Sequence, residues 1–359
     1  MPIHQSDLFR SGAGGYHTYR IPALLATSQG TVLAFCEGRH DSQSDSGDID
    51  ILARRSHDSG RTWDASYLVV SRPGFTCGNP CAVEDRRSGR VLLLFCMNPA
   101  AGGEEHVVQG HAKRTVWVSS SDDEGATWSE PREITESVKR SSWTWYATGP
   151  GHGIQLTTGR LVVACDHMLG TSANRARDPI HSHLITSDDG GLSWRIGGVM
   201  DAPTDECAVV QTADGRVHLN CRAGWREQEN YRGVAWSDDG GDSLSPIQWD
   251  RNLIEPVCQA GLVGFPATDR AAPAAVLFSN PAATDRRNLT ARMSTDCCLS
   301  WPVARSLHDG PAAYSDLAVL PNGSVCCIYE GGTAHPYEWL RCAIFDLAWL
   351  TDRDGGAAP

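Results

Sequence analysis

Short apolar runs separated by turn residues dominate the chain from end to end. Runs such as IDILARR (49–55) and RTVWVSS (114–120) have the length and the β-branched or aromatic content of strands. The sequences LTTGRLVV, TADGRVHL and LPNGSVCC each place a short glycine-containing turn between two such runs, which is typical of a β-hairpin. No helical period of useful length appears. The pattern therefore predicts an all-β fold.

Similar octapeptides follow several of these runs. They are SHDSGRTW (56–63), SDDEGATW (121–128), SDDGGLSW (187–194), SDDGGDSL (237–244) and STDCCLSW (294–301), and they start 50 to 66 residues apart. A period of this size is typical of a propeller or a solenoid. The third-position aspartate suits a turn whose N–H groups it caps, and the fifth-position glycine suits positive φ. We expect the closing tryptophan to pack back onto the strands.

The last two boxes depart from the pattern. Leu244 replaces the tryptophan of the fourth box, and Cys298 replaces the glycine of the fifth. The repeats predict four-stranded blades arranged around an axis. We expect the boxes to brace turns at a rim away from any active site.

The length of 359 residues would allow two ordinary domains or one large β domain. No linker separates two halves, so we predict a single domain over residues 1–350, followed by a disordered tail at 351–359. The net charge of -12 argues against a large nucleic-acid footprint, because phosphate binding needs a basic face. A local arginine cluster can still bind a small carboxylate.

The longest apolar run, VLLLFCM at 91–97, is too short to span a membrane. The N-terminus carries no apolar segment of signal-peptide length, which predicts a cytoplasmic protein; a secreted protein whose leader has been removed is the alternative. The thirteen cysteines lie mostly within apolar runs, which indicates buried thiols rather than disulfides. Cys77 and Cys81 lack a second ligand pair, so no metal and no other cofactor is expected.

The sequence YRIP at 19–22, combined with the boxes, resembles the sialidase (neuraminidase) superfamily, specifically the bacterial and animal exo-α-sialidases. The resemblance runs from about residue 10 to about residue 345. It implies a six-bladed β-propeller that acts on sialylated glycans or free sialosides. Such a substrate carries a carboxylate on the carbon where the bond breaks, so the site must hold an anion. Arginine is the side chain suited to that task.

The resemblance implies that three arginines bind this carboxylate. The matching positions are Arg20 in YRIP, Arg222 in VHLNCRAGW and Arg286 in NPAATDRRNLTARMS. Arg287 is the alternative for the third position. Because neighbours in a strand point to opposite faces, only one of the two can serve.

The resemblance also supplies the groups that would act on the glycosidic bond. A neutral tyrosine avoids the repulsion that an attacking carboxylate would meet from the substrate's own carboxylate, and sialidases use tyrosine. Tyr314 in AAYSDLAVL matches the nucleophile, and Glu206 in PTDECAVVQ matches the glutamate that takes its proton. Asp45 in SDSGDID matches the general acid and base.

Two further residues match supporting positions of the family. Glu330 in CCIYEGG matches the glutamate that holds the first arginine, and Arg39 in CEGRH matches an arginine beside the sugar ring. Trp145 and Tyr146 belong either to the pocket or to the core.

Other functions stay open on the sequence alone. The substrate could be another nonulosonic acid, such as deaminated sialic acid, or the enzyme could transfer the sugar to an acceptor. A non-catalytic glycan-binding propeller would explain the boxes and the arginines, but it would not need Tyr314, Glu206 and Asp45 together. A purely structural propeller would explain only the boxes. The oligomeric state is not readable from the sequence.

Overall fold

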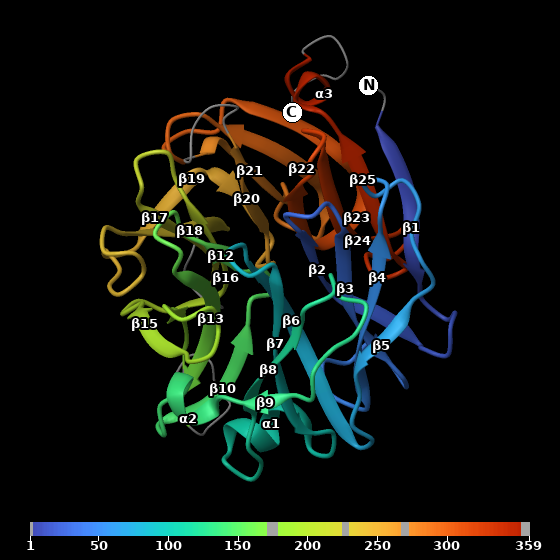
Figure 1. The fold of residues 1–359 in the computed structure, drawn as a ribbon, viewed down its shortest axis with the longest axis vertical. Helices are drawn as coiled ribbons and strands as arrows, with labels where there is room; N and C mark the ends of the chain where they lie inside the picture. Colours follow the sequence, from blue (N-terminus) through green and yellow to red (C-terminus); the bar gives the residue numbers. More distant parts are fainter. Residues whose placement is uncertain (1–2, 171–178, 225–229, 267–272, 353–359) are drawn as a thin grey trace.

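The computed structural model describes residues 3–170, 179–224, 230–266 and 273–352. Strands dominate this part of the chain, as the apolar pattern predicted (Figure 1). The described helices are short: α1 (Gly103–Val108), α2 (Thr135–Val138) and α3 (Leu347–Thr351). None of them has the length and apolar content needed to cross a membrane. Helix α3 includes the first residue of the tail predicted to be disordered, and residues 353–359 lie outside the described residues.

The described strands hydrogen-bond into four sheets. The first contains β2 (Thr18–Ala26), β3 (Val32–Arg39), β4 (Ile49–Ser56), β5 (Tyr67–Val70), β6 (Phe75–Asp85), β7 (Arg90–Pro99), β8 (Thr115–Ser121), β9 (Arg132–Glu133) and β11 (Gly151–His152). The second contains β10 (Trp143–Thr148), β12 (Ile154–Gln155), β13 (Leu161–Leu169), β14 (Ile180–Ser187) and β15 (Arg195–Val199). The third contains β16 (Thr204–Gln211), β17 (Val217–Ala223), β18 (Tyr231–Ser237) and β19 (Gln248–Ile254). The fourth contains β20 (Gly261–Pro266), β21 (Pro273–Pro281), β22 (Arg287–Ser294), β23 (Val303–Val319), β24 (Val325–Gly331), β25 (Trp339–Phe345) and β1 (His4–Arg10).

Each of the two larger sheets consists of two sets of antiparallel strands, and we call the place where the two sets join a seam. In the first sheet, β4 and β6 meet through a single parallel pair, Ile49 with Thr76. In the fourth, the long strand β23 pairs through Val303–Pro311 with β22 and through Ala312–Val319 with β24. Each seam therefore lies between two sets of consecutive antiparallel strands.

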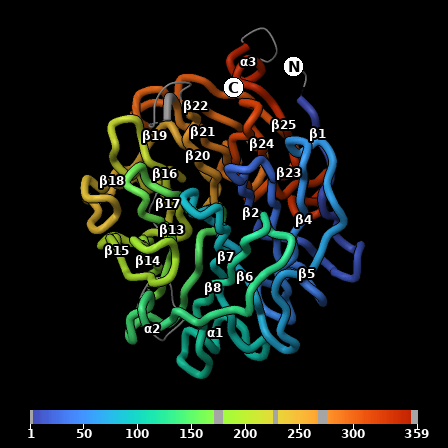
Figure 2. The backbone as a smooth tube through the Cα atoms, in the orientation of Figure 1, coloured from blue at the N-terminus to red at the C-terminus, as the bar shows by residue number. Residues whose placement is uncertain are grey.

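The sheets follow one another around a common centre in chain order (Figure 2). Strand β1, near the start of the chain, pairs antiparallel with β25, near its end, and this pairing joins the two ends of the fold. A strand within one set is therefore covered on each of its two faces by strands of an adjacent set. In β3, Leu33 and Phe35 pack with residues of β7, whereas Ala34 and Cys36 on the opposite face pack with residues of β24.

The cysteines belong largely to these buried strands. All thirteen are free thiols, and all except Cys297 are buried. They contribute to the apolar packing between sheets, as expected from the runs in which they lie.

The octapeptide boxes form the turns that the sequence predicted. In the first box, Asp58 accepts hydrogen bonds from the backbone N–H and the hydroxyl of Thr62 at 2.8 and 2.6 Å, and Gly60 has a φ of 78°. The aspartates of the other boxes make the same pair of bonds. The degenerate fifth box keeps the geometry with Cys298 at a φ of 66°. Trp194 and Trp301 are buried against the strands, as expected for the closing residue.

The boxes lie at the far ends of their strands from the residues that the sequence analysis selected. Strand β4, for example, begins at Ile49, after the loop that carries Asp45, and ends at Ser56, the first residue of a box. At the opposite end, five strands that line the centre have a β-bulge or a comparable break in register. The breaks lie between Arg20 and Ala23, Gly78 and Cys81, Trp143 and Tyr146, Thr204 and Cys207, and Ala312 and Ser315. A bulge turns side chains out of the regular alternation, so this end can direct several polar groups toward the centre.

Candidate active site

Arg20 lies at the bulge of β2 and is held by Glu330 of β24. Its Nε and Nη2 donate to Oε1 and Oε2 of Glu330 at 3.0 and 3.2 Å, in a bidentate pair that is almost fully buried. The next residue, Ile21, has a φ of 57°, a strained conformation for a β-branched residue, and its N–H donates to Glu330 at 2.9 Å. Burial alone would lower the pKa of Arg20, but the Glu330 carboxylate raises it, so the guanidinium stays charged.

Tyr314, Glu206 and Arg222 form a buried hydrogen-bonded group at the centre. The Tyr314 hydroxyl donates to Oε1 of Glu206 at 2.6 Å, and Nη1 of Arg222 donates to the Tyr314 oxygen at 3.0 Å. The same Nη1 contacts Oε2 of Glu206 at 2.7 Å. The residues come from β23, β16 and β17, and the bulges in β23 and β16 lie where Tyr314 and Glu206 project.

The electrostatics of this group keep the phenol neutral and make the glutamate a better proton acceptor. Burial, followed by the neighbouring Glu206, raises the pKa of Tyr314 well above its usual value, although nearby arginines oppose the shift. Burial also raises the pKa of Glu206; Arg222 opposes this rise and Asp205 adds to it.

Asp45 reaches the arginines from the loop between β3 and β4. Its side chain is 65% exposed, yet Oδ1 lies 3.2 Å from Nη1 of Arg20 and 2.8 Å from Nη1 of Arg39. Burial would raise the pKa of Asp45, but the charges of Arg39 and Arg20 outweigh it and lower the pKa below the usual range. In this state the carboxyl is ionised.

Arg39 forms the base of this loop. Its Nε and Nη2 donate to Oε2 of Glu37 at 3.0 and 2.6 Å, and Nη1 donates to the carbonyl of Gln43 at 2.6 Å. The Arg39 side chain is 2% exposed, so its contact with Asp45 ties the exposed loop to the buried end of β3.

Arg286 joins the cluster and Arg287 does not. Nη1 of Arg286 donates to the Tyr337 hydroxyl at 2.5 Å, Nη2 donates to the carbonyl of Val257 at 3.3 Å, and its Cζ lies 5.5 Å from the centre of the Tyr314 ring. Arg287 is exposed and pairs with Asp285 at 2.7 Å. The structure thus brings together all eight residues that the sequence analysis selected.

Several residues in the same region escaped the sequence analysis. Arg114 is buried, donates to the carbonyl of Tyr146 at 2.5 Å and to Oδ1 of Asn79 at 2.5 Å, and its Cζ lies 4.1 Å from the ring centre of Trp145. Asn79 lies at the bulge of β6 with a φ of 55°. Of the two aromatic residues left open, Tyr146 is fully buried in the core, and Trp145 is half-buried beneath Arg114. Tyr337 lies in the loop between β24 and β25, where no pattern marked it.

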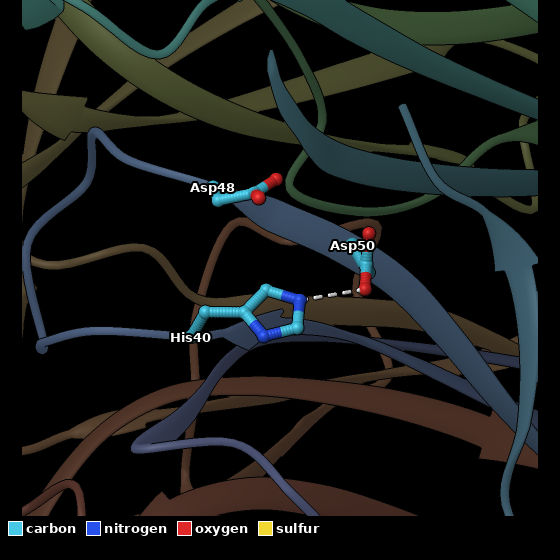
Figure 3. Close-up of side chains that lie close together, drawn as sticks. All are labelled: His40, Asp48 and Asp50. Atoms are coloured by element: carbon cyan, nitrogen blue, oxygen red, sulfur yellow. Dashed lines mark hydrogen bonds and ion pairs between the residues drawn. The ribbon is translucent and has the colours of Figure 1, made fainter. Parts of the chain in front are cut away.

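His40, Asp48 and Asp50 lie close together at the base of the Asp45 loop (Figure 3), with possible ligand atoms within 4.8 Å of one another. Nε2 of His40 contacts Oδ2 of Asp50 at 2.9 Å, and the Tyr16 hydroxyl donates to the same oxygen at 2.8 Å. These contacts hold the two ends of the loop together. That no metal binds stays a prediction from the sequence.

Comparisons with known proteins identify the family to which this chain belongs. The family model for a BNR repeat-like domain matches residues 30–327. An exo-α-sialidase of Aspergillus fumigatus is 30% identical over 94% of this chain and 86% of its own length. The chain belongs to the sialidase superfamily. A sialidase of Micromonospora viridifaciens is 34% identical over 96% of this chain, which spans only about half, 54%, of that protein.

The fold of this sialidase-family chain agrees with that of a solved relative. The structure of a Hadza microbial sialidase matches it with a TM-score of 0.86 at 28% identity, covering 96% of this chain and 69% of that one. The all-β, propeller-type architecture and membership of a glycoside hydrolase family are therefore established together.

Proposed function

We propose that the protein is an exo-α-sialidase that hydrolyses terminal α-linked sialic acids from glycoconjugates, with retention of configuration through a tyrosyl-enzyme intermediate. The observation that carries the proposal is the buried Tyr314 hydroxyl, hydrogen-bonded to Glu206 and Arg222 beside two further arginines. A surface that only bound an acidic glycan would need the arginines but not a tyrosine paired with a base.

The catalytic unit would be a single domain over residues 1–350 with six blades. The two seams support six sets of four strands. Cutting the first sheet between β4 and β6 leaves β2–β5 on one side and β6–β9 on the other, with the short β11 added to β6. Cutting the fourth within β23 leaves β20–β23 on one side and β23–β25 on the other, and β1 completes the last set. The third sheet supplies a fifth set, and the second supplies the sixth if β10 and the short β12, which both pair with β13, are counted as one strand position.

In the proposed reaction, Arg20, Arg222 and Arg286 bind the substrate carboxylate. Because that carboxylate would neutralise positive charge at Arg20, Asp45 would lose part of the interaction that lowers its pKa and could take up a proton. Arg39 would stay beside Asp45 and the sugar ring, and Glu330 would keep Arg20 in place.

The bond changes follow from these positions. Asp45 protonates the leaving oxygen as the glycosidic bond breaks, while Tyr314 gives its proton to Glu206 and its oxygen bonds to the anomeric carbon. Asp45, now ionised, then removes a proton from a water molecule that releases the sugar, and Glu206 returns its proton to the phenolate. Each of the two displacements inverts the configuration of the anomeric carbon, so the two together retain it. The steps use side chains and water, without a metal ion or an organic cofactor.

Release of 4-methylumbelliferone from its α-N-acetylneuraminide tests the activity. Wild type should turn over this substrate, and the Asp45→Ala and Tyr314→Phe variants should lose at least about 100-fold in kcat. Incubation with a 3-fluoro sialosyl fluoride should add one sugar mass to a peptide containing Tyr314, and NMR should show the α anomer released first. A Tyr314→Phe variant with an unimpaired rate would disprove the assigned nucleophile.

The same assay separates the alternatives. The deaminated substrate run in parallel gives the preference at the acylamino position, and an added lactose acceptor reveals transfer to sugar instead of water. A folded protein that binds sialic acid but releases no fluorophore from either substrate would instead be a glycan-binding propeller.

A further inference from the structure

Tyr337 connects two of the three arginines of the proposed carboxylate site. Its hydroxyl oxygen accepts a hydrogen bond from Nη1 of Arg286 at 2.5 Å. The guanidinium carbon of Arg20 lies 4.0 Å from the centre of its ring, within the distance of a cation–π contact. The ring also packs against the small buried cluster of Ile21, Cys258, Ala313 and Tyr314. One side chain thus contacts the edge of one arginine and the face of another.

The loop that carries Tyr337 is held in a defined shape. The carboxylate of the next residue, Glu338, accepts the consecutive N–H groups of residues 333–335 at 3.0, 2.8 and 2.9 Å. The Ser11 hydroxyl donates to the carbonyl of Tyr337 at 2.7 Å, which ties the loop to the segment after β1. The phenol is therefore positioned by backbone contacts that do not involve the arginines.

The phenol retains a hydrogen that it can donate. Burial raises the pKa of Tyr337, although Arg20 opposes the rise, so the hydroxyl stays protonated near neutral pH. A phenol can donate one hydrogen bond while accepting others, and the contact with Arg286 uses only its acceptor side. Among the described residues, none accepts a hydrogen bond from the Tyr337 hydroxyl.

We propose that Tyr337 is a specificity residue for the substrate carboxylate: it fixes Arg20 and Arg286 relative to each other, and its hydroxyl donates to a carboxylate oxygen. The inference rests on the proposed function, because it assumes that the arginines bind the carboxylate of a sialoside. It adds a neutral donor to a site otherwise built from guanidinium groups.

The Tyr337→Phe variant keeps the ring over Arg20 and removes the hydroxyl. We expect KM for the umbelliferyl sialoside to rise about tenfold with kcat changed by less than about threefold, because a contact made equally in ground and transition states is lost. In calorimetry, the variant should bind the 2,3-unsaturated glycal of sialic acid about tenfold more weakly, and the neutral methyl ester of that glycal equally well. Tyr67→Phe is the matched control, because it removes a phenol bonded to the carbonyl of Gly125, in a box at the other end of the strands.

A double variant tests whether Tyr337 acts through Arg286. If it does, the Tyr337→Phe substitution should weaken glycal binding by a clearly smaller factor when it is made in the Arg286→Met variant than when it is made in wild type. The inference would be overturned if the Tyr337→Phe variant bound the glycal acid as tightly as wild type does, or if its affinity for the acid and for the methyl ester fell by the same factor. Either result would leave the proposed function intact. A wild type that neither cleaves the sialoside nor binds the glycal would overturn both.

Discussion

Replacing Glu330 by glutamine should destabilise the protein more than the same substitution at a buried glutamate that forms no ion pair. Glu330 is fully buried and accepts four hydrogen bonds, two from Arg20 and one each from the backbone N–H groups of Ile21 and Tyr314. A glutamine of the same size accepts through one oxygen only, turns an N–H₂ group toward donors and leaves the exposed Asp45 as the remaining counter-charge of Arg20. Removing one partner of a buried ion pair costs about 3–5 kcal/mol.

Thermal unfolding measures this cost. At about 2 °C per kcal/mol for a chain of this size, Tm should fall by about 6–10 °C. Glu84→Gln is the matched control, since Glu84 is also buried but accepts from the N–H and hydroxyl of Ser28 and forms no ion pair within the described residues. We expect that control to lose about 1–2 kcal/mol. If both variants melted within about 2 °C of each other, the argument that the arginine pair dominates the cost would be refuted.

Three further predictions follow from the site and the boxes. Arg39→Leu removes a charge that lowers the pKa of Asp45, so the alkaline limb of kcat/KM against pH should move to higher pH; an unmoved limb would contradict Asp45 as the acid. Arg286→Lys should raise KM about tenfold or more, whereas Arg287→Lys should leave it unchanged, and equal effects in steady-state assays would reverse this assignment. The folded-state pKa of Asp58 is lowered to about 2, so the ionised Asp58 stabilises the fold above its unfolded pKa, and this stabilisation is lost as the pH falls toward 2. The Tm difference between wild type and Asp58→Ala should therefore shrink over that range. A Tm difference that stayed constant would contradict this interpretation.

The sequence predicted the parts of this fold that depend on local pattern. The all-β class and the box turns follow from short-range rules, and even the degenerate fifth box keeps its geometry with Cys298 in place of glycine. The eight selected residues came from the family resemblance rather than from spacing, and the structure brings them together. Arg286 could be preferred over Arg287 only provisionally, because that choice depends on which neighbour faces the centre.

The register breaks explain why other residues were missed. Period-two alternation assigns each strand residue to a face, but a bulge reverses the assignment beyond it, and nothing in the sequence marks the bulges beside Asn79 and Tyr146. Tyr337 lies in a loop whose shape depends on a carboxylate bound to three backbone N–H groups, and that arrangement has no periodic signal.

The balance of charge within the site would let this acidic protein attract the acidic substrate that we propose for it. Arg20, Arg39 and Arg222 each form an ion pair with a carboxylate, so their charges are largely offset before the substrate arrives. Arg286 forms no ion pair within the described residues; its partners are the phenol of Tyr337 and a backbone carbonyl. Among the three arginines proposed to bind the carboxylate, the uncompensated positive charge therefore lies at Arg286, where a neutral partner orients the guanidinium without cancelling it. In the proposed carboxylate site, Arg20 and Arg222 would define the shape, and Arg286 would supply most of the net attraction for an anion.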